Sequence, residues 1–311
     1  MKNNDFSFFG FEKLNYVADN LLNILFNEAT EVSISVILDK ICVSPPYFTF
    51  KKIYKYQNIL IAQAKVEQPI DNEIASISIG EAGRHMAILG TCICAIDQGD
   101  KYYYLVKNAK TSLVIQDITS LCNNENDLYI AIESRYIDNK IANAYGILFN
   151  TEKKVIYQLE ASYNKVKTTL FSRLFKKHAE EIKPSKESPY RKQITFENKE
   201  INHEKLLFSI PEIEKERCAG HFKNYPILPT AFVIYNIISH VGNFLLEKNN
   251  KKRYYITEVR LSLLELLFLK SEKEVEITYR NMNRSNLYQV SCNITQDKKK
   301  NADVIFYINL I

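Results

Sequence analysis

The chain has 311 residues, of which 46% are hydrophobic and 25% charged, a composition typical of a globular protein and unlike that of a disordered or fibrous one. Lysine and arginine (41) exceed aspartate and glutamate (36) by only 5, so overall charge does not favour nucleic acid as a partner. No run of apolar residues approaches the roughly 18 residues of a membrane span.

The first half of the chain predicts a leading helix, strands and one buried helix. Apolar residues at helical spacing over 11–27 predict the leading helix. Residues 32–43 and 47–66, separated by Pro45-Pro46, predict strands. From Asp71 to Ile96 apolar and small residues predominate, which is typical of a helix buried on most sides. Further strands are expected at 102–115, 128–149 and 155–165.

The second half repeats this order after a charged connector. Residues 167–200 contain Pro184 and Pro189 and predict the connector, with a short helix near its start. A strand is expected at 206–210, a helix at 230–246, and strands at 254–269, 274–280, 287–295 and 304–310. Tyrosine (20) and phenylalanine (17) are abundant while glycine (8) is scarce, which favours antiparallel strands over a glycine-rich nucleotide-binding fold.

The loop before the second buried helix carries the most specific motif. His221, in Gly-His-Phe, is followed by a Pro-x-x-Pro that ends at Pro229. This resembles the signature loop of hotdog-fold 3-hydroxyacyl-carrier-protein dehydratases, in which that histidine is catalytic. Lys223, Asn224 and Thr230 stand where the family usually has Pro, Gly and Gly. A structural or surface histidine is the alternative interpretation of His221.

The family's acidic residue lies fourteen positions after the histidine, and 221 + 14 is Tyr235 here. A phenol with a pKa near 10 is a poor general acid at neutral pH. The first buried helix offers Glu81, with Arg84 and His85 after it, which resembles the family's acid-x-x-x-Gln/His pattern. The i, i+4 spacing lets His85 orient the Glu81 carboxyl group. An exposed ion pair between Glu81 and Arg84 is the alternative.

Each half therefore lacks what the other has, because fourteen positions before Glu81 lies Glu67 rather than a histidine. The resemblance implies a fused pseudo-dimer with one hybrid site, His221 with Glu81, and one decayed site, Glu67 with Tyr235. The expected fold class is α+β, a double hotdog with two central helices each wrapped by an antiparallel sheet. The expected parts are an N-terminal helical segment (1–29), a first hotdog domain (30–166), the connector (167–200) and a second hotdog domain (201–311).

The resemblance also implies a reaction, the dehydration of a 3-hydroxyacyl thioester to a trans-2-enoyl thioester in fatty-acid or polyketide-type lipid synthesis. His221 would act as general base, and Glu81, kept protonated by an apolar tunnel, as general acid. Phe222, Pro229 and Thr230 would contact the substrate, with backbone N–H groups near Thr230 polarising the thioester carbonyl. The substrate would arrive on the phosphopantetheine of a carrier protein or coenzyme A, without a metal or redox cofactor.

Two other functions remain open at this stage: a hotdog acyl-thioesterase, and a non-catalytic acyl-binding or scaffolding subunit. A basic cluster in the connector could meet an acidic acyl carrier protein, although it could also be a solvated connector. Its members are Arg173, Lys176, Lys177, Lys183 and Lys186. Association into a further homo- or hetero-oligomer is also open.

The cysteines and the N-terminus bear on cellular location. Six cysteines occur without a Cys-x-x-Cys pair, so we expect reduced, mostly buried thiols and no zinc site. Residues Met1 to Gly10 lack the basic-then-apolar order of a secretory signal. The sequence therefore predicts a cytoplasmic protein without a metal site.

Overall fold

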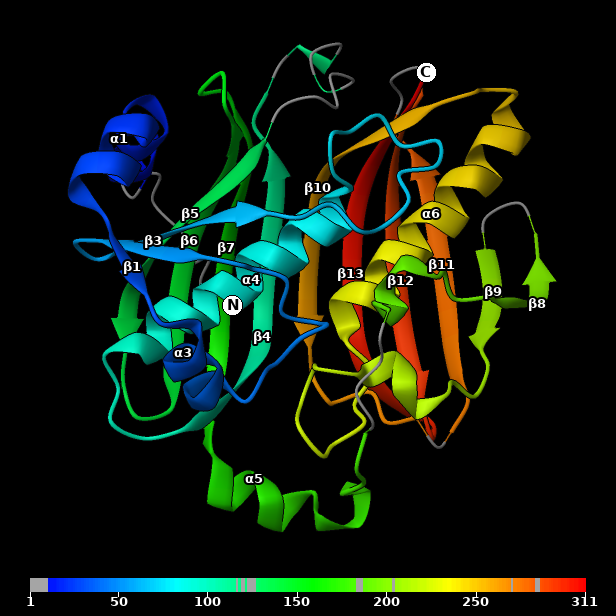
Figure 1. The fold of residues 1–311 in the computed structure, drawn as a ribbon. Coiled ribbons are helices and arrows are strands. Elements are labelled where there is room, and N and C mark those ends of the chain that lie inside the picture. The colour runs from blue at the N-terminus through cyan, green and yellow to red at the C-terminus, as the bar shows by residue number, and fades with distance from the viewer. Residues whose placement is uncertain are drawn as a thin grey trace.

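The computed structural model describes residues 11–311 except for 116, 119–120, 122–126, 183–186, 203–204, 270 and 283–285. Its described strands form one antiparallel sheet, and two long helices, α4 and α6, lie on the same face of that sheet (Figure 1). Lys183 and Lys186 of the expected basic cluster lie outside the described residues.

The sheet has thirteen strands in the order β1-β2-β3-β5-β6-β7-β4-β10-β13-β12-β11-β9-β8 among the described residues. The first half supplies β1 (Thr30–Val32), β2 (Ile53–Tyr56), β3 (Ile59–Ala64), β4 (Tyr102–Leu113), β5 (Leu128–Ile137), β6 (Ile141–Asn150) and β7 (Val155–Lys167). The second half supplies β8 (Glu197–Ile201), β9 (Lys205–Ile210), β10 (Tyr254–Leu263), β11 (Lys273–Asn281), β12 (Leu287–Gln296) and β13 (Lys299–Leu310).

The two halves join where β4 pairs with β10. The register places Thr111 opposite Val259 and Ala109 opposite Leu261, so that the hydrogen-bonded ladder continues from one half into the other. The sheets of the two halves therefore run on into one another. The arrangement fits a double hotdog.

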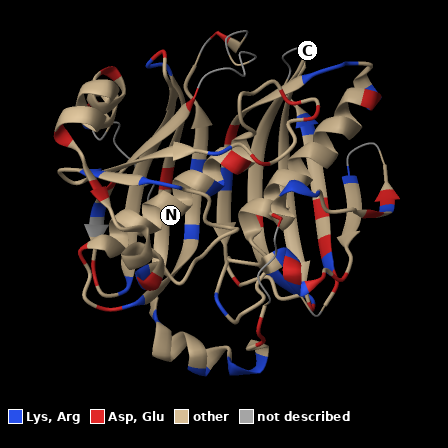
Figure 2. Ribbon diagram, viewed as in Figure 1, with Lys and Arg blue, Asp and Glu red and all other residues tan. Residues whose placement is uncertain are grey.

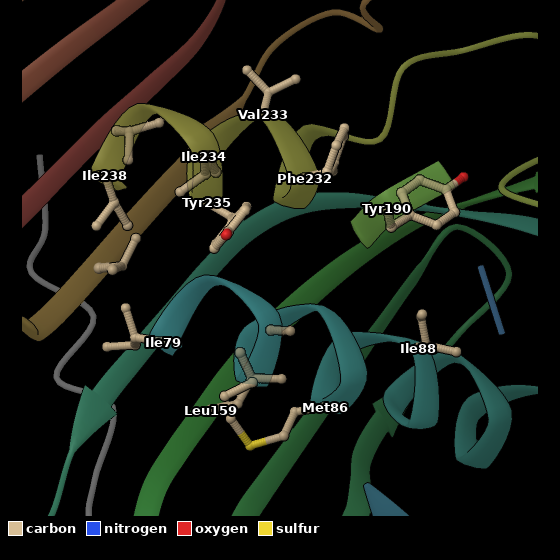
Figure 3. Close-up of a cluster of buried hydrophobic side chains, with 14 of the residues drawn as sticks. Ile79, Met86, Ile88, Leu159, Tyr190, Phe232, Val233, Ile234, Tyr235 and Ile238 are labelled. Carbon is tan, nitrogen blue, oxygen red and sulfur yellow. The ribbon is translucent and has the colours of Figure 1, made fainter. Parts of the chain in front are cut away.

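Helix α4 (Ile79–Ile96) is buried along most of its length and begins at a side-chain cap. Ser78 Oγ accepts a hydrogen bond from the Glu81 backbone N–H at 3.2 Å, which satisfies one of the free donors of the first turn. The other long helix, α6 (Thr230–Asn249), follows Pro229 and ends where Asn250 adopts a left-handed conformation, φ 51°. Figure 3 shows apolar side chains of α4 and α6, among them Ile79 and Ile234, filling the space between the two helices.

The two central helices cross at Gly80. A Cβ atom at this position would lie 2.9 Å from both Cα and Cβ of Tyr235. Contacts that short are not tolerated, and the Tyr235 backbone cannot move away without shifting α6. The crossing distance of α4 and α6 therefore depends on this glycine.

We expect Gly80→Ala to destabilise the protein by about 1–3 kcal/mol in chemical unfolding, because the added methyl group forces the two helices apart. Alanine otherwise favours a helix over glycine by about 1 kcal/mol, so the sign of the change is diagnostic. Gly99→Ala is the control, since nothing lies within 4 Å of its added Cβ atom. A stabilised Gly80→Ala variant would show that the helices do not meet here.

The shorter helices cover the edges and ends of the sheet. Helices α1 (Glu12–Asp19) and α2 (Leu21–Asn23), with the π-helical turn η1 (Ile24–Glu28), pack their apolar side chains on Ile59, Ile61 and Phe149. Neighbouring strand residues such as Leu60 and Leu148 point to the α4 side, as the two-residue period of a strand requires. The remaining short helices are α3 (Ile34–Ile41), α5 (Thr168–Leu174), η3 (Lys176–His178), η4 (Pro189–Arg191) and η5 (Lys215–Cys218).

Four sequence predictions of secondary structure are wrong in detail. The expected strand at 32–43 is mostly helix α3, whose buried residues Ile37 and Ile41 are one turn apart. The expected strand at 128–149 is a hairpin of β5 and β6, and the strand at 47–66 contains the hairpin of β2 and β3. The first central helix begins at Ile79 and not near Asp71, which places Glu81 in the first turn of the helix.

None of the described helices is long and apolar enough to cross a membrane.

Candidate active site

A mostly apolar cavity lies between the two central helices and the strands that join the halves. Its volume is about 120 Å³. Helix α4 lines it with Ile79 and Ile88, α6 with Ile234, and β10 with Val259 and Leu261. Cavities that bind ligands combine such apolar walls with a few polar groups. Both halves contribute to the wall, so the cavity exists only because they are paired.

His221 lies in the loop that enters α6 and lines this cavity. Its Nδ1 is 2.9 Å from the Ile227 carbonyl oxygen, so Nδ1–H donates to that oxygen. The ring stacks on Phe222, with centroids 4.2 Å apart, and meets the Tyr47 ring edge-on at 4.8 Å. Burial lowers the pKa of His221 to about 4, which makes the imidazole neutral at pH 7. Its Nε2 then carries a lone pair, and no described residue donates a hydrogen bond to it.

Arg84 of α4 lines the same cavity and is 1% exposed. Its Nη2 donates to Glu81 Oε1 at 3.1 Å and to Glu67 Oε2 at 3.3 Å. The guanidinium carbon lies 5.5 Å from the centre of the Tyr47 ring and 5.4 Å from that of Tyr190. Arg84 Nε and Nη1 have no hydrogen-bond partner among the described residues. Two buried N–H positions of a permanent cation are thus unsatisfied, which is costly unless a ligand accepts from them.

The Tyr47 ring lies near both His221 and Arg84. The centre of the Tyr47 ring lies 4.8 Å from the centre of the His221 ring, and the Arg84 guanidinium carbon lies 5.5 Å from the centre of the Tyr47 ring. Burial raises the pKa of the Tyr47 phenol to about 12, so it is neutral at pH 7. The cavity therefore holds a neutral base and a cation that both contact one aromatic ring.

Glu81 does not belong to the lining of this cavity. Its carboxylate accepts from the backbone N–H groups of Glu67 at 2.9 Å and Gln68 at 3.1 Å, and from Arg84. Burial acts to raise its pKa, but the hydrogen bond and charge of His85, then the charge of Arg84 and the Glu67 N–H, outweigh burial and lower it. The prediction that Glu81 lies protonated in an apolar tunnel is therefore wrong.

His85 also faces away from the cavity lining. Its Nε2 lies 2.9 Å from the Lys65 carbonyl oxygen and 3.4 Å from Glu81 Oε1, and its Nδ1 lies 3.2 Å from Thr49 Oγ1. Burial, followed by the charge of Arg84, lowers the pKa of the imidazole. The expected contact between His85 and Glu81 is present, and it serves a buried network around Arg84.

The structure brings some of the predicted site residues together and separates others. The cavity is lined by His221, Arg84, Phe222 and Thr230. Pro229 directly precedes α6 and does not line the cavity. No described contact joins His221 with Glu81. Glu67, which was expected in a decayed second site with Tyr235, instead binds Arg84, Lys65 and Ser188. Tyr235 donates to the Pro69 carbonyl oxygen at 2.7 Å.

The register of the two central helices explains this outcome. Arg84 is the sixth residue of α4, counted from Ile79, and Tyr235 is the sixth residue of α6, counted from Thr230. Glu81 is only the third residue of α4, so it and Tyr235 do not hold matching places. The residue of α4 in the place that matches Tyr235 is Arg84, and it lines the cavity together with His221.

A second buried carboxyl group lies outside the cavity, at the entrance to α4. Glu73 is 3% exposed, and its Oε1 accepts from the Ile79 backbone N–H at 3.1 Å. Burial raises its pKa to about 8, and the nearby charge of Asp71 acts in the same direction. Glu73 is therefore mainly protonated at pH 7 in the folded protein and ionised in the unfolded one.

We expect Glu73→Gln to increase the free energy of unfolding relative to the wild type, by an amount that grows as the pH rises. Because the folded pKa of Glu73 is raised, its contribution to stability is complete below about pH 4.5 and is lost as the pH rises toward 8. Glutamine mimics the protonated carboxyl group and has no proton to lose, so the variant should gain about 2.5 kcal/mol at pH 7 relative to pH 5. Urea unfolding at the two pH values measures this, and an equal effect at both would refute the assignment.

The described residues contain no group of three or more His, Cys, Asp or Glu side chains placed to hold a metal ion. Burial raises the pKa of the described buried thiols, for example those of Cys92 and Cys218, so they are protonated at pH 7. The polar side chains that line the cavity include His221, Arg84 and Thr230.

The fold is shared with solved thioesterases at low sequence identity. The tesB protein of Mycobacterium avium subs. paratuberculosis has a TM-score of 0.52 and 8% identity, over 90% of this chain and 100% of that one. The acyl-CoA thioesterase II TesB2 of Mycobacterium marinum has a TM-score of 0.50 and 8% identity, over 90% and 97%. The 12:0-ACP thioesterase of Umbellularia californica has a TM-score of 0.55 and 7% identity, over 81% and 94%.

These similarities show that the chain shares its fold with these proteins, and at such identities they carry nothing about its substrate. No family model matches the sequence, and no curated protein matches it. The hotdog part of the expected resemblance is therefore supported. Its dehydratase part is not, since the neighbours named above are thioesterases.

Proposed function

We propose that the protein hydrolyses acyl thioesters, with the acyl chain in the apolar cavity and the thioester group beside His221. The observation that carries the proposal is the pair of polar groups in the cavity: a neutral imidazole with a free Nε2, and an arginine with two unsatisfied N–H positions. Hydrolysis needs a base for water and a cation or donor for the oxyanion. The thioesterase neighbours make the same reaction class plausible for the fold.

In the proposed reaction, His221 Nε2 takes a proton from a water molecule as the water oxygen attacks the thioester carbonyl carbon. The negative charge that develops on the carbonyl oxygen is stabilised by the free Nε–H and Nη1–H groups of Arg84. The C–S bond then breaks and the thiolate leaves. A thiol has a pKa near 8.5, so the thiolate departs without a strong general acid. Water is the only co-reactant.

Dehydration makes a different demand, which this cavity meets poorly. Its leaving group is a hydroxide, which needs a proton donor near the β-carbon. The cavity lining contains no Asp or Glu among the described residues, and Glu81 is held ionised behind Arg84. Arginine keeps its proton at any ordinary pH and cannot donate it. We therefore favour hydrolysis over the dehydration that the loop motif implies.

The His221 pKa of about 4 also favours one further candidate, an acyl-binding protein without catalysis, because so weak a base activates water slowly. In either case the apolar cavity takes the acyl chain and the thioester is carried by coenzyme A or by an acidic acyl carrier protein.

The test is to follow two products separately, from a saturated acyl-CoA and from the 3-hydroxyacyl-CoA of the same length. A thiol-reactive dye reports hydrolysis, and the ultraviolet absorbance of the conjugated enoyl thioester reports dehydration. Thiol release from both substrates without enoyl formation is expected. Enoyl formation without thiol release would contradict the proposal and restore the dehydratase interpretation. Tight binding without either product would identify an acyl-binding protein.

A further inference from the structure

Helix α5 and the turn η3 form a projection at one end of the molecule, below the sheet in Figure 1. Five side chains on its outer surface, which we call the connector ridge, are exposed: Leu170, Arg173, Leu174, Lys176 and Lys177. Leu170 is 49% exposed and Leu174 is 62% exposed. The two leucines are four residues apart and thus share one side of the helix, with Arg173 next to them.

The inner side of the same projection is fixed to the wall of the candidate active site. Phe171 stacks on Tyr103, with ring centroids 3.8 Å apart and planes 19° apart, and meets the Phe222 ring edge-on at 5.7 Å. Phe222 in turn stacks on His221. The exposed ridge is therefore held two aromatic rings away from the proposed base.

The charges of the ridge are not neutralised. The sequence contains no acidic residue between Glu160 and Glu180. Arg173, Lys176 and Lys177 form no ion pair among the described residues, and Figure 2 shows blue segments on this projection. Their neighbours differ, because Lys167 pairs with Asp100 at 2.9 Å and Lys215 with Glu180 at 2.7 Å.

We propose that the connector ridge is the docking surface for an acidic carrier protein that delivers the acyl thioester to the His221 cavity. The nature of the cargo rests on the proposed function, whereas the docking itself does not. Two exposed leucines framed by three unpaired cations are complementary to a small apolar spot with an acidic rim. A partner seated on the ridge would be separated from Phe222 by Phe171, so a flexible arm on that partner would have a short path to the cavity.

A protein fits this surface better than a lipid bilayer does. Helices that lie in membranes present a broad apolar face that extends over several turns. Helix α5 spans seven residues and exposes two leucines, and its remaining large apolar residue, Phe171, is turned inward and buried. The acidic protein is therefore the partner we infer, and an anionic bilayer is kept as an outcome of the test.

The test compares carrier-bound and small substrates in a charge-reversed variant, Arg173→Glu/Lys176→Glu/Lys177→Glu. The same acyl chain is offered on an acidic acyl carrier protein and on pantetheine. We expect kcat/KM for the carrier-bound thioester to fall at least tenfold and to lose its dependence on salt, while kcat/KM for the pantetheine thioester stays unchanged. An equal change for both substrates, or none for either, would overturn the proposal.

A matched control reverses three exposed lysines elsewhere, in the variant Lys153→Glu/Lys154→Glu/Lys252→Glu. The first two of these lysines flank the start of β7, whereas the ridge follows the end of that strand. The control has the same change in net charge and should keep full activity toward the carrier-bound substrate. Leu170→Ser/Leu174→Ser tests the apolar part of the ridge and should weaken carrier binding without changing turnover of the pantetheine thioester.

Direct binding separates failure of the docking proposal from failure of the proposed function. If neither thioester is hydrolysed, the proposed function fails, and the affinity of the unloaded carrier protein for wild type and the ridge variant still decides the docking. Carrier binding that the ridge variant loses supports the docking surface. Binding to phosphatidylglycerol vesicles that the ridge variant loses, without any carrier binding, would overturn it in favour of a membrane contact.

Discussion

His221→Ala should lower kcat for thiol release by about 10²–10⁴-fold, the range that a positioned general base contributes. The reason is that Nε2 of His221 is the free base in the cavity, while its Nδ1–H is held by the Ile227 carbonyl oxygen. Steady-state assays with one acyl-CoA measure the effect. His221→Gln should be as inactive as His221→Ala, since an amide can replace the hydrogen bond to Ile227 but cannot take the proton.

The control for this variant is His240→Ala. His240 lies on α6 outside the cavity lining, with its Nε2 3.2 Å from Asn198 Oδ1 and its ring against Phe196 and Phe208. This variant should keep nearly full activity. Circular dichroism and thermal unfolding should show that all three histidine variants are folded. A folded His221→Ala protein with unchanged thiol release would remove His221 from the reaction.

Arg84→Met should destabilise the protein by about 3–5 kcal/mol and abolish thiol release. The substitution leaves Glu67 and Glu81 as two buried carboxylates without their shared cation, and breaking a buried ion pair has an effect of this size. Urea unfolding at pH 7 measures the loss. Arg84→Lys should recover part of the stability but little of the activity, because an ammonium group lacks the planar fork of N–H donors.

The destabilisation caused by Arg84→Met should depend on pH. In the wild type the pKa of Glu81 is lowered, so its contribution to stability is present above about pH 4.5 and is lost as the pH falls further. Without Arg84, Glu81 loses one of the charges that lower its pKa, so this pKa should rise, and the penalty should be greatest near pH 7 and should shrink as the pH falls. A destabilisation that does not change with pH would indicate lost packing alone.

Two variants complete this comparison. Adding Glu81→Gln to Arg84→Met should restore part of the lost stability, because one unpaired buried charge is removed. Lys52→Met removes an exposed partner of Glu31, with side chains 62% and 54% exposed, and should change stability by no more than about 1 kcal/mol. If Arg84→Met were as mild as Lys52→Met, the network around Arg84 would contribute little to the fold.

The sequence indicated the architecture well because the strongest signals in it are local. The two buried helices have long apolar patterns, and the helix expected at 230–246 lies within α6. The expected strands after each helix correspond to β4–β7 and β10–β13, with the hairpin of β5 and β6 merged into one. The error at α3 arose because Ile and Val favour strands, whereas the spacing of Ile37 and Ile41 fits a helix.

The site was less predictable, because its residues come together through contacts between distant segments. The fourteen-residue offsets could not show where α4 begins, although Ser78 and Glu81 form the Ser-x-x-Glu pattern of a helix start. With that start, Glu81 falls in the first turn, where the backbone at Glu67 folds over it. No local pattern pointed to Tyr47, whose place beside His221 depends on the path of the chain after α3.

The pH dependence of kcat/KM for thiol release tests most directly whether the buried His221 is the base. Since only the neutral imidazole can accept a proton, and burial lowers its pKa to about 4, the rate should be flat from pH 7 down to pH 5 and should fall by half near pH 4. Circular dichroism at each pH confirms that the protein stays folded. A fall centred near pH 6.5, the value of an exposed histidine, would contradict the account, as would a profile that His221→Gln leaves unchanged in both rate and shape.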